Sequence, residues 1–154
     1  MKHPPGDRMT LGISVIITSC FTASLSSIGF TQSTQARYEG QERCGNRASE
    51  VFKADYGQQI MLDQDGTLFF NYRNHYNAAL NKCFFLEITK ILGYRAKTPY
   101  SATMYRLYDI DENREYGSFY KRSDAPSPVD CQILGKSCAS EAGWELLIKR
   151  FMED

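Results

Sequence analysis

The sequence has no excess of charge of either sign. Its 18 lysines and arginines balance 18 aspartates and glutamates, and no polybasic run is present. Nucleic-acid binders need basic side chains to neutralise phosphates, and anionic membrane surfaces attract polybasic segments. We therefore expect no nucleic-acid partner. A chain of 154 residues is long enough for one domain.

Three motifs are also absent. There is no Cys-x-x-Cys pair and there are only two histidines, so the cysteines lack the spacing of a zinc site. There is no Gly-x-Ser-x-Gly elbow of the kind that carries a nucleophilic serine. The most apolar stretch, residues 9–30, contains many serines and threonines and makes a poor membrane helix. We expect neither a metal nor another cofactor.

The amino-terminal residues have the pattern of an export signal. Lys2 and Arg8 form a positive region, and residues 9–17 form a short apolar region of suitable length. Residues 17–20, Ile-Thr-Ser-Cys, resemble a degenerate bacterial lipobox, in which Cys20 would be the lipid attachment site and the mature amino terminus. The sequence therefore predicts a lipoprotein anchored to a membrane through Cys20.

Two other outcomes stay open for the leader. The export peptidase could cut after Ala36, where small residues occupy the required positions, or residues 9–30 could stay as an uncleaved span. We expect residues 1–36 to be a signal or lipoprotein leader with a flexible tether rich in Ser, Thr and Gln. Residues 37–154 then form a single domain. Removal of Lys2, Asp7 and Arg8 with the leader leaves 16 basic and 17 acidic side chains, a net charge of about −1.

The cysteine count favours two disulfides. Once Cys20 is set apart as a lipid carrier, four cysteines remain: Cys44, Cys83, Cys131 and Cys138. An even number of cysteines suits an oxidising compartment. Pairs Cys44–Cys83 and Cys131–Cys138 fit the expected elements, but four cysteines allow three pairings and the sequence does not choose between them. We expect an exported cell-envelope protein, either periplasmic or lipid-anchored at Cys20, with secretion as the alternative.

Hydrophobic periodicity predicts an α+β domain. Phe84, Leu86 and Ile88 alternate with Cys83, Glu87 and Thr89, which indicates a central strand over residues 80–92. We expect a small antiparallel sheet of three to five strands, with an N-terminal and a C-terminal helix packed on one face. The other expected elements are a helix over residues 42–56, a polar link at 58–67, strands at 67–72, 103–110 and 115–121, a loop at 93–102, and a short hairpin between Cys131 and Cys138. On the strand at 115–121, Tyr116, Ser118 and Tyr120 alternate with Gly117 and Phe119. The last expected element is a helix capped by Ser140, with an apolar stripe that includes Trp144 and Ile148.

Several short motifs occur together in residues 42–153. They include Asn74-His75-Tyr76-Asn77, the later Cys83-Phe84, Leu107-Tyr108-Asp109, and the pair Cys131 and Cys138. In this combination the chain resembles an uncharacterised family of small exported bacterial proteins. The resemblance implies an exported domain with disulfides, and it implies no activity for any residue.

His75 is the candidate catalytic residue, because histidine exchanges protons near neutral pH. Glu87 or Asp109 could serve as its carboxylate partner. The competing interpretation is that His75 hydrogen-bonds within an Asn-rich turn. Two fragments, residues 63–68 and 109–113, resemble parts of calcium loops, but both lack ligands at positions where the loop geometry is strictest, so we interpret them as solvated turns.

The tyrosine-rich hairpin is the candidate binding surface. Tyr105, Tyr108, Tyr116 and Tyr120, with Arg106, offer aromatic faces and hydrogen-bond donors suited to an envelope protein or a polysaccharide. One face of the hairpin must belong to the core, so at most half of these tyrosines can be free. We expect a non-enzymatic binding module. A small periplasmic hydrolase using His75 and a purely structural envelope component are the alternatives.

Overall fold

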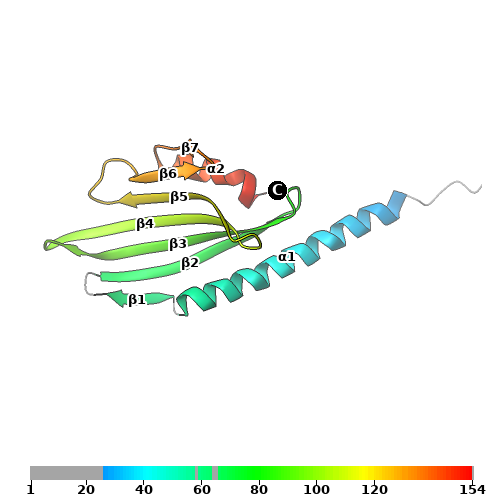
Figure 1. Cartoon of the computed structure of the whole chain (residues 1–154), viewed down its shortest axis with the longest axis horizontal. Helices are drawn as coiled ribbons and strands as arrows, with labels where there is room; N and C mark the ends of the chain where they lie inside the picture. Colours follow the sequence, from blue (N-terminus) through cyan, green and yellow to red (C-terminus); the bar gives the residue numbers. More distant parts are fainter. Residues whose placement is uncertain (1–25, 58, 64–65, 154) are drawn as a thin grey trace, which may run out of the picture.

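A seven-stranded antiparallel sheet organises the chain, and its strands follow one another in sequence order (Figure 1). The computed structural model describes residues 26–57, 59–63 and 66–153. Each strand pairs with the next one along the chain, so the sheet is a continuous meander. The elements are α1 Ser26–Tyr56, β1 Ile60–Asp63, β2 Gly66–Asn77, β3 Lys82–Arg95, β4 Thr98–Asp109, β5 Arg114–Arg122, β6 Asp130–Ile133, β7 Lys136–Ser137 and α2 Glu141–Met152.

The central strand β3 has the alternation that the sequence predicts. Phe84 and Leu86 point to the side covered by α2, whereas Cys83 and Phe85 point to the side covered by α1. All four side chains are buried, at 3% exposure or less. A strand buried on both faces needs a cover on each, so the two helices lie on opposite faces of the sheet.

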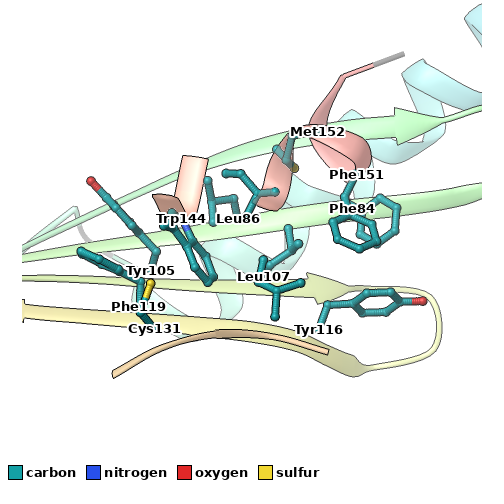
Figure 2. Packing of buried hydrophobic residues seen from close by; sticks show 12 residues of the cluster. Phe84, Leu86, Tyr105, Leu107, Tyr116, Phe119, Cys131, Trp144, Phe151 and Met152 are labelled. Atoms are coloured by element: carbon teal, nitrogen blue, oxygen red, sulfur yellow. The ribbon is translucent and has the colours of Figure 1, made fainter. Parts of the chain in front are cut away.

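The two helices thus define two cores. On the α2 side, buried aromatic and aliphatic side chains from β3 to β6 pack against the helix (Figure 2). On the α1 side, Cys44, Ala48 and Phe52 of the helix pack against β3, with partly buried aromatic side chains of β2 around them. The α2-side core comprises Phe84, Leu86, Tyr105, Leu107, Tyr116, Phe119, Cys131, Ile133, Trp144, Ile148, Phe151 and Met152.

This architecture confirms the α+β class and corrects two expectations. The sheet has seven strands instead of three to five, and the helices do not share one face. The extra strands include β1, which lies where a polar link was expected. The loop expected at residues 93–102 is a tight hairpin, because Ala96 and Lys97 both adopt positive φ, at 51° and 69°. Such turns usually contain Asn or Gly, so the sequence carried no signal for this one.

Helix α1 begins at Ser26, well before the expected start at residue 42. Residues 26–35, expected to be part of the flexible tether, are therefore helical, and the expected boundary between residues 36 and 37 lies inside the helix. Once the packed half of a helix is formed, each further residue adds one backbone hydrogen bond without a new nucleation cost. Figure 1 shows this amino-terminal half extending beyond the sheet.

Two disulfides are present, with the pairing that fitted the expected elements. Cys44–Cys83 joins α1 to β3, with Cα atoms 5.3 Å apart, and Cys131–Cys138 closes the β6–β7 hairpin, with Cα atoms 5.1 Å apart. Disulfides of this kind indicate an oxidising compartment. Within the described part of the chain, no helix has the length and apolar character needed to cross a membrane. Cys20 lies outside the described residues.

Candidate functional site

One face of the sheet is only partly covered. Helix α1 packs along β2 and reaches β3, which leaves β4 and β5 open on that side. A groove with a volume of about 660 Å³ runs between the helix and β4, and we call it the α1–β4 groove. Its lining residues are Arg47, Val51, Asp55 and Tyr56 of α1, Phe85 and Glu87 of β3, Arg106 and Tyr108 of β4, and Ile110 and Asn113 of the following turn.

Arg106 is the centre of the charged groups in this groove. It lies opposite Glu87 in the register of β3 and β4, and its Nη1 is 3.8 Å from a Glu87 carboxylate oxygen. Its Nη2 donates a hydrogen bond to Glu115 at 3.1 Å. The guanidinium lies 4.8 Å from the centre of the Tyr108 ring, within the range of a cation–π contact. One arginine therefore joins two carboxylates and an aromatic face.

Two tyrosines flank this arginine and stay protonated at neutral pH. Burial raises the pKa of Tyr108 to about 12, against the opposing effect of the nearby Arg106 charge. Burial, followed by a hydrogen bond to Glu87, raises the pKa of Tyr56 well above its ordinary value. Both phenols thus serve as neutral hydrogen-bond donors and apolar faces. No serine, cysteine or histidine is among the described residues that line the groove.

The five residues expected to form one binding surface lie on both faces of the sheet. Arg106, Tyr108 and Tyr120 are on the α1 side. Tyr105 and Tyr116 are buried in the α2-side core at 9% exposure (Figure 2). The Tyr105 hydroxyl also donates a hydrogen bond to Glu141. The strict alternation expected for β5 fails at a shift in register between β4 and β5. This bulge makes Tyr116 an extra residue in β5 and turns its ring into the core.

His75 is not brought together with its expected carboxylate partners. It pairs with Phe84 in the sheet and therefore faces α2, whereas Glu87 faces α1. Asp109 is on the α2 side, but Phe84 lies between the two residues in the strand register. Burial and then the charge of Arg37 lower the pKa of His75, against the opposing effect of Glu153. The geometry therefore assembles no histidine–carboxylate pair from these residues.

The Asp109 carboxylate is engaged within the fold. It is fully buried, forms an ion pair with Lys82, and accepts backbone hydrogen bonds from Asp111 at 3.1 Å and Glu112 at 3.4 Å. These contacts fix the turn between β4 and β5. Among the described residues no cluster of three His, Cys, Asp or Glu side chains could hold a metal ion. Residues 64 and 65 of the other calcium-like fragment lie outside the described residues.

Sequence reasoning missed Tyr56 and Tyr100 as members of the open face. Tyr56 is the last residue of α1, and Tyr100 lies in the segment expected to be a loop. A helix-terminal tyrosine has no distinctive pattern, and only the position of α1 on the sheet places it beside Glu87. The fold and the groove define a disulfide-stabilised α+β meander with one polar, partly open face. No protein-family model, curated protein or solved structure matches this chain.

Proposed function

We propose that the protein is a non-enzymatic binding module of the cell envelope and that the α1–β4 groove is its binding surface. The observation that carries this proposal is the partial cover of the sheet by α1. Because the helix reaches across the sheet only as far as β3, the Arg106 and Tyr108 side chains of β4 line a groove. Arginine and tyrosine, together with tryptophan, are the residue types enriched among the hot spots of protein interfaces.

The charge arrangement favours a partner with both donors and acceptors. Glu87 is 13% exposed and Arg106 is 42% exposed, so the groove has a shielded carboxylate beneath a more accessible guanidinium. Ion pairs in partly desolvated positions give binding specificity and hold a partner in one orientation. A polar segment of an envelope protein or a polysaccharide meets these requirements better than an apolar ligand does.

The proposed location combines the disulfides with the amino-terminal pattern. Two disulfides indicate an oxidising compartment, and the lipobox-like residues 17–20 would place a lipid on Cys20. We propose that the domain is held in the periplasm by this lipid. Secretion after cleavage behind Ala36 is the alternative.

The proposal is tested by retention of envelope components on the immobilised full-length protein. We expect a reproducible partner for the wild type and at least a fivefold loss of retention for Arg106→Gln combined with Tyr108→Ala. Arg73→Gln is the matched control, because Arg73 is a half-exposed arginine that pairs with Glu145 on the opposite face of the sheet at 3.6 Å. Retention of nothing, or equal retention by all three proteins, would contradict the proposal.

A further inference from the structure

A second hollow lies on the α1 side, past the carboxyl end of the helix. Figure 1 shows the β3–β4 hairpin continuing beyond that end of α1. The hollow has a volume of about 450 Å³, which is within the range of small-ligand sites. Its main lining residues are Leu68, Ile91, Arg95, Tyr100, Tyr120 and Arg122, and we call it the tyrosine–arginine hollow.

Its floor is partly apolar and partly aromatic. Leu68 and Ile91 are direct neighbours across β2 and β3. The hydroxyl oxygens of Tyr100 and Tyr120 lie 3.0 Å apart and form a hydrogen bond. Only one of the two O–H groups can donate in this pair, so the other remains directed away from it. The hollow therefore offers ring faces together with a phenolic donor.

Its rim carries more positive than negative charge. Arg122 Nε lies 2.9 Å from Asp124, and Arg95 Nη1 lies 3.5 Å from the same carboxylate. Two guanidinium groups thus share one carboxylate, and one positive charge in the cluster has no counterpart within it. Arg95 precedes the two turn residues with positive φ, Ala96 and Lys97, and non-glycine residues rarely adopt this conformation without a structural reason. The turn holds Arg95 at the edge of the hollow.

We propose that the tyrosine–arginine hollow binds a carboxylated sugar unit of an envelope glycan. The proposal adds a second binding site to the protein and stands independently of the α1–β4 groove. The C–H face of a pyranose ring can pack on the tyrosine rings, and its hydroxyl groups can bond to the phenols. A planar carboxylate matches the fork of a guanidinium and supplies the missing negative charge. A neutral sugar would leave that charge uncompensated.

The test measures binding of trigalacturonate to the full-length protein by titration calorimetry. Neutral galactotriose and galactose 6-phosphate serve as comparison probes. We expect trigalacturonate to bind roughly tenfold or more tightly than galactotriose, and Arg122→Gln to remove most of this difference. Arg95→Gln removes the other positive charge of the cluster. The Arg95 side chain is 64% exposed, so its replacement should not disturb folding. Arg73→Gln, a half-exposed arginine that pairs with Glu145 on the opposite face of the sheet, is the control that leaves the affinity unchanged.

Three outcomes would overturn the inference: equal affinity for the acidic and neutral trisaccharides, unchanged affinity in both arginine variants, or tighter binding of the sugar phosphate. Tyr120→Phe gives an independent check of the phenol's role in binding, because it removes the hydroxyl without changing the ring.

The two proposals can be separated. If partner retention still depends on Arg106 but trigalacturonate does not bind, only the inference about the tyrosine–arginine hollow fails. If trigalacturonate binds as expected but retention of envelope partners does not depend on Arg106, the proposed role of the α1–β4 groove fails instead.

Discussion

Gly40 of α1 lies directly against the ring of Tyr76 on β2. A Cβ atom at Gly40 would be only 2.3 Å from Tyr76 Cε1, closer than side-chain carbons come in folded proteins. The ring cannot move freely, because the Tyr76 hydroxyl donates a hydrogen bond to Asn81 at 2.7 Å. The contact therefore fixes how closely α1 approaches β2 at Gly40.

We predict that Gly40→Ala destabilises the protein. Overpacking costs about 1–3 kcal/mol, whereas replacing glycine by alanine in a helix gains about 0.5–1 kcal/mol, so the net effect is a loss. Gly45→Ala is the matched control in the same helix, since its nearest neighbour would be Asn74 Nδ2 at 3.9 Å. This control should stabilise the protein by roughly 0.5–1 kcal/mol. Urea unfolding measures both, and equal stabilisation by the two alanines would refute the close contact.

Loss of the two disulfides should have unequal effects. The Cys44–Cys83 bridge spans 39 residues and the Cys131–Cys138 bridge spans 7. In the chain-entropy model the longer loop gives about 1.5 kcal/mol more stability, and Cys44 and Cys83 are also the more deeply buried pair. We expect the double alanine variant at 44 and 83 to have the lower free energy of unfolding. The reverse order would show that local packing around the β6–β7 hairpin outweighs loop entropy.

The ion pair of Lys82 and Asp109 should make stability fall at alkaline pH. Hydrogen bonds to Asp109 and then to Glu112 raise the pKa of Lys82 above its ordinary value of 10.5. A group with a raised pKa in the folded state contributes its full stability below the unfolded pKa and loses it as the pH rises through the folded pKa. Lys82→Met should therefore lower Tm at pH 7. The difference in Tm between this variant and the wild type should become smaller above about pH 10.5.

Lys149→Met is the control for this experiment. Lys149 also forms an ion pair, with Glu153 at 3.4 Å, but both side chains are more than half exposed. Exposed pairs contribute little to stability, so its Tm should stay close to wild type at every pH. A gap between wild type and Lys82→Met that does not change from pH 7 to pH 11 would argue against a role for the charge.

The proposed lipid attachment predicts a change in location. We expect Cys20→Ala to release the protein from membranes of the host and to abolish its labelling with radioactive fatty acid. Sequencing of the mature amino terminus separates the alternatives, since a terminus at residue 37 would instead show cleavage behind Ala36. Cys44→Ala, which breaks a disulfide without touching the leader, should leave any fatty-acid labelling intact.

The sequence predicted the parts of the fold that depend on local pattern. The alternation around Phe84 and the helical stripe of Trp144 and Ile148 each lie within one element and were assigned correctly. The missed elements had weak local signals. β1 is four residues long, and the start of α1 is polar, so neither has a periodic apolar face. The inward direction of Tyr116 depended on a bulge, where β5 has one more residue than the paired segment of β4.

The sequence by itself determined the alternating strand around Phe84, the helix after Ser140 and an even set of cysteines suited to oxidation, because periodicity and residue counts are properties of the chain alone. Only the tertiary structure decided that the helices take opposite faces, that Asp109 is engaged by Lys82 instead of His75, and that Arg106 meets Tyr108 in an open groove. These relationships depend on strand register and on how far α1 reaches across the sheet, and both are set by contacts between residues distant in sequence.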